Sequence, residues 1–97
     1  MGTALRSAVI LWADPLRAPA PLFGQPTYKQ AVEIVGGYIQ LIDLRNGRTL
    51  VVDEEGLLKG YPTNERATEL TRGIALVDRE RGVVGNVILL TGWKGVK

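Results

Sequence analysis

The chain has 97 residues with 12 basic and 10 acidic side chains, and it contains neither histidine nor cysteine. This length suits one domain, so we expect residues 1–97 to form a single domain. Without imidazole or thiol, Ser-His-Asp triads, cysteine nucleophiles and the common zinc sites are excluded within this chain. The net charge of +2 is too balanced to call for nucleic acid as a partner. We therefore expect no ordinary hydrolase, no metal and no cofactor.

The first apolar run lies in "LRSAVILWAD" and predicts a buried strand that ends at Asp14-Pro15. It is too short to cross a membrane and has no clear cleavage site, so we expect no membrane partner and a cytoplasmic location. Prolines at 15, 19, 21 and 26 then predict an extended loop over 15–26 without regular structure. Such a long loop is typical of a functional segment or an arm that packs on a neighbour.

The segment "TYKQAVEIVGG", residues 27–37, predicts an amphipathic helix. Pro26-Thr27 suits its start and Gly36-Gly37 suits its end. Its apolar residues have the i, i+3, i+4, i+7 spacing of one helical face: Tyr28, Ala31, Val32 and Val35.

A hairpin is the clearest expected element, because Asn46-Gly47 stands between two apolar runs and suits the positive φ angles of a type I′ turn. A two-residue loop predicts four cross-strand pairs: Arg45 with Arg48, Leu44 with Thr49, Ile42 with Val51, and Leu41 with Val52. Strand alternation then predicts one apolar face: Ile39, Leu41, Leu50 and Val52. The other face is mixed, and we expect it to lie under another element or to meet another chain: Tyr38, Ile42, Leu44 and Val51 beside Gln40, Thr49 and Asp53.

The segment 63–73 predicts a short helix, capped by Thr63 or Asn64 and directed inward by Ala67 and Leu70. Strand-like segments follow in "IALV" (74–77) and "VVGNVILL" (83–90), and the tail predicts a loop anchored by Trp93. The order is β-α-β-β-α-β, with one extra strand if both of these segments form strands. We expect an α+β domain with two short helices on one side of a small, mostly antiparallel sheet, an order that permits a ferredoxin-like topology.

Four short motifs stand out together over residues 37–85. Their residues are Gly37, Tyr38 and Ile39; Val51, Val52, Asp53, Glu54, Gly56 and Gly60; Pro62, Asn64, Ala67 and Thr68; and Val84 and Gly85. In this combination they resemble a small domain family that is common in bacteriophages and prophages, domain of unknown function 3846. The resemblance covers roughly residues 35–92, leaves the proline-rich loop outside, and carries no assigned activity. In phages it implies anti-defence or immune-evasion roles, such as a sponge that sequesters a nucleotide signal of antiphage immunity.

Asn64 and Arg66 at the start of the second helix are the first candidate ligand-binding residues. A helix N-terminus offers free N–H groups and a favourable dipole to a phosphate. Arg66 would add a bidentate contact, and Tyr61 a stacking surface for a base. The structural alternative is a cap, an exposed arginine and a packed tyrosine, and the known preference of asparagine for caps favours it.

Lys59 is another candidate ligand contact, and it follows three carboxylates in the same turn: Asp53, Glu54 and Glu55. Paired carboxylates bind cations or run acid–base chemistry. Adjacent strand residues point to opposite faces, however, which favours a solvated turn.

Aromatic residues at Trp12, Tyr38 and Trp93 either sandwich a nucleobase beside arginines or pack in a core or dimer, and packing is the safer interpretation. Tyr38 stays a candidate stacking surface. "GVVGNV" (82–87) lacks the Gly-Lys-Ser/Thr ending of a phosphate loop, so Gly85 there is expected to mark a bulge or a close backbone approach.

These features favour a non-enzymatic, phage-encoded binding protein that sequesters a nucleotide or cyclic nucleotide signal. Phosphates would meet Asn64 and Arg66, a base would stack on Tyr61 or Tyr38, and a homo-oligomer would share pockets between chains. The alternative is an inhibitor that binds a host protein through a sheet face or the proline-rich arm. An enzyme using carboxylate or lysine chemistry is the third, weakest possibility.

Overall fold

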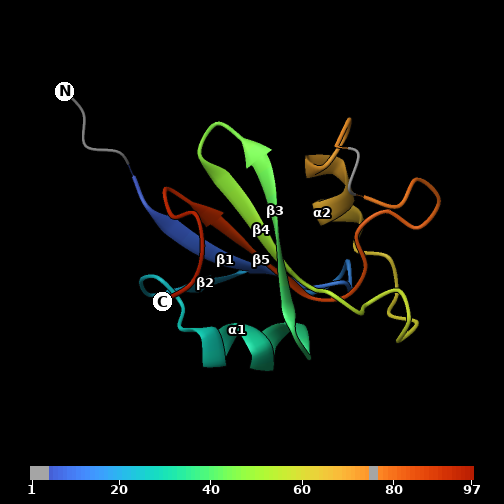
Figure 1. The fold of residues 1–97 in the computed structure, drawn as a ribbon, viewed down its shortest axis with the longest axis horizontal. Coiled ribbons are helices and arrows are strands. Elements are labelled where there is room, and N and C mark those ends of the chain that lie inside the picture. The colour runs from blue at the N-terminus through green and yellow to red at the C-terminus, as the bar shows by residue number, and fades with distance from the viewer. Residues whose placement is uncertain (1–4, 75–76) are drawn as a thin grey trace.

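The computed structural model describes residues 5–74 and 77–97, which form one five-stranded antiparallel sheet and two helices (Figure 1). The strand order across the sheet is β2-β1-β5-β4-β3. The α+β class is as expected, with one additional strand between β1 and α1. The elements are β1 (Ser7–Leu11), β2 (Ala20–Leu22), α1 (Tyr28–Val35), β3 (Ile39–Arg45), β4 (Arg48–Asp53), α2 (Glu65–Leu70) and β5 (Val87–Thr91).

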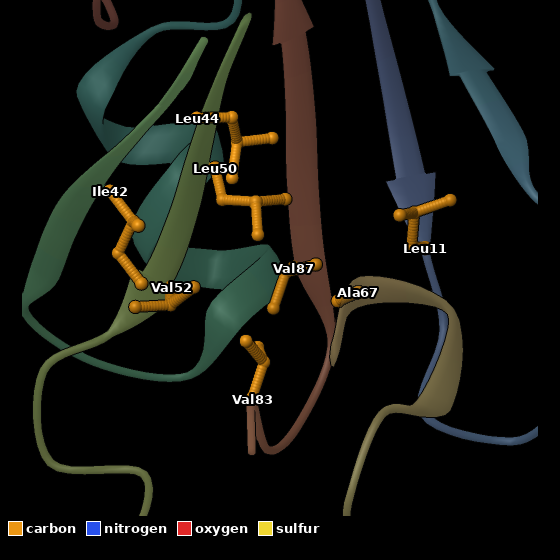
Figure 2. Packing of buried hydrophobic residues seen from close by; sticks show 8 residues of the cluster. All are labelled: Leu11, Ile42, Leu44, Leu50, Val52, Ala67, Val83 and Val87. Carbon is orange, nitrogen blue, oxygen red and sulfur yellow. The ribbon is translucent and has the colours of Figure 1, made fainter. Parts of the chain in front are cut away.

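The two helices cover opposite faces of the sheet, so the expectation that both lie on one side is wrong. Leu50 belongs to the same buried cluster as Ala67 of α2, whereas its neighbour Val51 belongs to the cluster that contains Ala31 of α1. Adjacent strand residues point to opposite faces, so the two clusters are separated by the sheet. In Figure 2 the side chains of the α2 side project forward while α1 runs behind the strands. Because β4 and β5 are apolar on both faces, each face needs a cover.

We name the two cores by the helix that covers them. The α2-side cluster consists of Leu11, Ile42, Leu44, Leu50, Val52, Ala67, Val83 and Val87. The α1-side cluster consists of Ala8, Ala31, Val35, Val51, Ile88 and Leu90, with Trp93 packed against it.

The ferredoxin-like topology is not confirmed. That topology is built from split β-α-β units, in which the strands before and after a helix are parallel and another strand lies between them. Here β4 and β5 precede and follow α2, yet they are adjacent and antiparallel.

The hairpin turn is confirmed at Asn46-Gly47, with φ angles of 59° and 75°, and Arg45 faces Arg48 as expected. Beyond that pair the expected register is wrong, because a β-bulge between Asp43 and Arg45 leaves Leu44 without an opposite residue. Ile42 consequently faces Leu50, and Leu41 faces Val51. A shift of one residue moves side chains to the other face. The residues of the α2-side cluster on this hairpin are therefore Ile42, Leu44, Leu50 and Val52.

The proline-rich loop contains a short strand, so the expected absence of regular structure over 15–26 is wrong for Ala20–Leu22. Pro21 lies opposite Val9 of β1. A proline cannot donate to a ladder, and it is tolerated here because β2 is an edge strand.

The helix boundaries follow their caps. Thr27 and Gln30 form a reciprocal capping box at the start of α1, and Gly36 ends it with a φ of 100°. Asn64 caps α2, which ends at Leu70 rather than reaching Gly73. The strand expected over 74–77 includes residues 75 and 76, which lie outside the described residues.

The last strand begins at Val87, four residues later than expected, after a stretch that contacts the 61–64 segment. Gly85 donates its N–H to the Pro62 carbonyl, and a Cβ at Gly85 would lie 2.6 Å from the Tyr61 ring. The close backbone approach expected at Gly85 is therefore confirmed.

Candidate functional site

Asp53, at the end of β4, is the centre of a polar cluster formed with Lys59 and Tyr61. The side chain of Asp53 is 1% exposed, and Lys59 Nζ lies 2.8 Å from its Oδ2. The same ammonium donates to the Gly36 carbonyl at 3.1 Å, at the C-terminus of α1. The Glu55 N–H donates to Asp53 Oδ1 at 2.8 Å. We call these three side chains the Asp53 cluster; they join the end of β4, the following turn and α1.

The two charges of the Asp53 cluster stabilise each other. Burial raises the pKa of the Asp53 carboxyl, but hydrogen bonds from Lys59, the Glu55 N–H and Tyr61 outweigh it and leave that pKa below its usual value. The hydrogen bond to Asp53 raises the pKa of Lys59, against a smaller opposing effect of desolvation. Lys59 is therefore held protonated, which suits a fixed cation and not a nucleophilic amine.

Glycines make room for the Asp53 cluster. A Cβ at Gly37 would overlap Lys59 Nζ, and a Cβ at Gly36 would lie 2.5 Å from the Tyr61 hydroxyl oxygen. Tyr61 is also packed against Gly85, as described above. Close packing against Lys59 and Tyr61 therefore accounts for these three glycines without any ligand.

Asn64 is an internal brace. Its side chain is 0% exposed, its Nδ2 donates to the carbonyls of Leu11 and Gly85 at 2.9 Å each, and its Oδ1 accepts the Ala67 N–H at 3.1 Å. These bonds connect β1, the segment before β5 and α2. Because no atom of Asn64 is accessible, a ligand cannot contact it in this conformation.

Arg66 holds the proline-rich loop. Its Nη1 donates to the Arg17 carbonyl and its Nη2 to the Pro15 carbonyl, each at 2.7 Å. The guanidinium is thereby occupied by backbone, and its fork geometry fixes two carbonyls at once. Arg66 thus acts on the loop and leaves its neighbour Arg17 to face the adjacent cavity.

A cavity of about 410 Å³ lies between this loop and the C-terminus of α1. The Arg17 guanidinium stacks on Trp12, with its central carbon 3.5 Å from the ring centroid, and no salt bridge involves Arg17 within residues 5–74 and 77–97. Asn86 accepts the Ala13 N–H through Oδ1 at 2.9 Å. We call this space the Trp12 cavity. Its lining residues include Trp12, Asp14, Arg17, Tyr61, Gly36 and Asn86.

The five residues predicted to bind a ligand do not converge on one site. Tyr61 lines the Trp12 cavity, and Arg66 touches only the loop that borders it. Asn64 is enclosed and Lys59 is paired with Asp53. Tyr38 is 69% exposed and does not line this cavity.

Sequence reasoning missed Arg17 and Asn86 as cavity residues. The available signal was the turn "ADPLR": Asp14 Oδ1 accepts the Leu16 N–H, and this Asx-turn returns the chain so that Arg17 meets Trp12. Of the three aromatic candidates, Trp12 alone lines the Trp12 cavity, whereas Trp93 packs against the α1-side cluster.

Other chemical sites find no support in the described part of the chain. Glu54 and Glu55 are exposed, as a solvated turn requires. Across residues 5–74 and 77–97, no three Asp or Glu side chains gather closely enough to hold a metal ion. In the same residues, neither helix has the length and apolar character needed to cross a membrane.

Comparisons with known proteins give one match. The family model described as domain of unknown function (DUF3846) matches residues 8–95. No curated protein and no solved structure matches the chain. The matched range includes the Asp53 cluster and the whole lining of the Trp12 cavity. The chain therefore belongs to the DUF3846 family.

Proposed function

We propose that this chain is a non-enzymatic, phage-encoded binding protein that sequesters a small nucleotide-type signal, such as a cyclic nucleotide of antiphage immunity, in the Trp12 cavity. The observation that carries the proposal is the convergence of Trp12, Arg17 and Tyr61 on one cavity of about 410 Å³. This volume lies in the range typical of small-molecule sites. Aromatic rings and guanidinium planes both stack on nucleobases.

The charges around the cavity favour a ligand of low negative charge. Arg17 supplies a cation, while Asp14 and the carbonyl end of α1 at Gly36 supply negative charge and negative dipole. Asp14 and the carbonyl end of α1 would repel the high negative charge of a triphosphate. A phosphodiester, which carries one charge for each linkage, fits the balance better, and Asn86 offers a neutral amide beside it.

The Asp53 cluster supports binding without conversion. Its lysine is protonated and hydrogen-bonded to carboxylate and carbonyl, so it supplies neither a free base nor a nucleophile. The cluster fixes Tyr61 and the end of α1, which form one wall of the cavity. A rigid wall reduces the ordering cost of binding.

Calorimetric titration with cyclic dinucleotides, cyclic trinucleotides, nucleoside monophosphates and triphosphates tests the proposal. We expect saturable binding of at least one phosphodiester ligand, weaker binding of triphosphates, and unchanged ligand on chromatography after incubation. Arg17→Ala should weaken binding at least tenfold, whereas the matched variant Arg79→Ala, in the exposed 78–82 turn, should bind normally. Silence across the panel, or ligand turnover, would overturn the proposal.

A second candidate function is inhibition of a host protein through the proline-rich arm. Leu16 and Phe23 in this segment are 93% and 102% exposed, so both apolar side chains are accessible to a partner. A helix packs on part of each sheet face, whereas the arm presents two exposed apolar side chains, so the arm is the better candidate surface for a host protein. Retention of one host protein by wild-type chain but not by Phe23→Ser would support inhibition; equal retention by both would contradict it.

A further inference from the structure

The two edges of the sheet differ in their ability to accept another strand. β2 has three residues and contains Pro21, whereas β3 has seven residues and no proline. Short length and proline protect an edge, while a long edge with free backbone groups is a template for pairing. The bulge between Asp43 and Arg45 interrupts β3 only near the hairpin turn. The segment from Ile39 to Asp43 is therefore an open edge.

The backbone groups that point outward from this edge follow from the ladder. The Glu54 N–H donates to the Tyr38 carbonyl, so Tyr38 faces β4. Alternation along an antiparallel ladder directs Gln40 and Ile42 the same way and directs the N–H and C=O groups of Ile39 and Leu41 outward. Within the described residues, no backbone hydrogen bond outside the β3–β4 ladder involves residues 39 to 45.

We propose that two copies of this chain pair through antiparallel β3 strands centred on Gln40, which joins the two sheets into one. In this register Ile39 lies opposite Leu41 of the second copy, and each pair exchanges two backbone hydrogen bonds. Leu41 is 42% exposed in the single chain and would be covered by this pairing. Apolar cross-strand pairs of this kind stabilise sheets.

Neighbouring registers are less favourable. Centring the pair on Leu41 would place Ile39 opposite the Asp43 carboxylate, and centring it on Ile42 would place Leu41 there. Centring it on Ile39 shortens the ladder. Gln40 is thus the centre at which Ile39 and Leu41 pair with each other and neither lies opposite a carboxylate.

Charge complementarity supports the same register. Asp43 of one copy lies opposite Gly37 of the other, and Lys59 Nζ occupies the space where a side chain at Gly37 would be. The Lys59 side chain is 35% exposed, so a second carboxylate can approach it. Two-fold symmetry repeats the contact, and each Asp43 meets the Lys59 ammonium of the other copy.

A single cysteine tests the pairing directly, because the chain contains none. At Gln40→Cys the two Cα atoms would lie about 4.5 Å apart, as in a non-hydrogen-bonded antiparallel pair, within the range of a disulfide. We expect Gln40→Cys to form a covalent dimer rapidly under mild oxidation. The matched variant Asp43→Cys, whose opposite residue is Gly37, should cross-link at least tenfold more slowly. Equal rates would overturn the register.

Sedimentation equilibrium tests the association without a cross-link. Wild-type chain should have twice the monomer mass of 10.6 kDa at micromolar concentration. Leu41→Lys should raise the dimer dissociation constant at least tenfold, whereas Leu58→Lys, exposed but away from the edge, should leave it unchanged. Monomeric wild type, or a Leu41→Lys dimer of normal affinity, would contradict the proposal. Melting curves of every variant confirm that each one folds.

Discussion

Two neighbouring regions of the molecule use polar side chains in opposite ways. In the segment from Asp53 to Asn64, the side chains of Lys59 and Asn64 donate to backbone carbonyls of distant elements, so their hydrogen-bonding capacity is used inside the fold. In the segment from Trp12 to Arg17, the cation stacks on an aromatic ring at the border of a cavity. The comparison shows that the segment from Asp53 to Asn64, which holds many of the family-matching residues, stabilises the fold. The candidate binding groups lie beside this segment.

Of the substitutions in the segment from Asp53 to Asn64, we expect Asn64→Ala to lower the stability of the fold most. Asn64→Ala leaves the Leu11 and Gly85 carbonyls without their donor and removes the cap of α2. Buried unsatisfied groups cost roughly 1–3 kcal/mol each, so we expect a loss of about 3–5 kcal/mol in the free energy of unfolding, measured by urea denaturation. Asn64→Asp keeps the cap oxygen and should retain part of the stability. A loss below about 1 kcal/mol would show that the brace is not structural.

Gly85→Ala should cause the next largest loss of stability. The new Cβ would lie 2.6 Å from the Tyr61 ring at a φ of 79°. Overpacking typically costs about 1–3 kcal/mol, and the positive φ adds about 1 kcal/mol. The control Gly60→Ala has a φ of 73° but open space around its Cβ, so it should show the φ cost alone. Thermal melting of the two variants separates the steric contribution, and equal melting temperatures would exclude it.

Arg66→Ala should release the loop of the second region with little effect on global stability. The variant loses two hydrogen bonds from a charged group to the carbonyls of Pro15 and Arg17. We expect trypsin to cleave after Arg17 roughly tenfold faster, equivalent to about 1.4 kcal/mol. Arg72→Ala, which removes only the exposed pair with Glu69, should leave the cleavage rate at Arg17 unchanged. If both variants are cleaved alike, Arg66 does not position the loop.

The smallest expected effect is the pH dependence of the Asp53 cluster. Asp53 has a lowered pKa in the fold, so its stabilisation is present above its unfolded pKa near 3.8 and is lost as the pH falls through the lowered value. Lys59 has a raised pKa, so its contribution is present below 10.5 and is lost as the pH rises through the raised value. Asp53→Asn should flatten the melting temperature against pH at both ends. If the dependence of melting temperature on pH is the same in Asp53→Asn and wild type, the Asp53 cluster does not contribute to the pH dependence of stability.

The local parts of the fold could be predicted from the sequence because their causes are local. The capping box of Thr27 and Gln30, the Gly36 terminus and the Asn46-Gly47 turn each depend on residues within one turn of chain. The hairpin register could not be predicted, since the bulge at Leu44 has no local signature here and it moves Ile42 and Leu41 by one position. The face of the sheet that α1 covers could not be predicted either, because β4 and β5 are apolar on both faces.

The candidate site was harder to predict because its contacts join residues that are far apart in the sequence. The sequence predicts a cap at Thr63 or Asn64, but it gives no sign of the two carbonyl partners of Asn64, which are 53 and 21 residues away in the chain. Sequence alone favours Lys59 and Tyr61 as ligand contacts, because only the folded sheet and α1 bring their internal partners, Asp53 and Gly36, next to them. Arg17 lay in a loop expected to have no regular structure, and Arg66 places it through bonds that no spacing rule describes.

The binding claim is tested most directly by the fluorescence of Trp12. In Trp93→Phe this residue is the single tryptophan, so its emission reports on the Trp12 cavity alone. We predict that a cyclic dinucleotide or trinucleotide changes this emission until the sites are saturated, at a ratio of ligand to chains that is fixed by the number of cavities. In the same background, Arg17→Ala should remove the change. Emission that stays constant while calorimetry detects binding would place the ligand elsewhere and contradict the account.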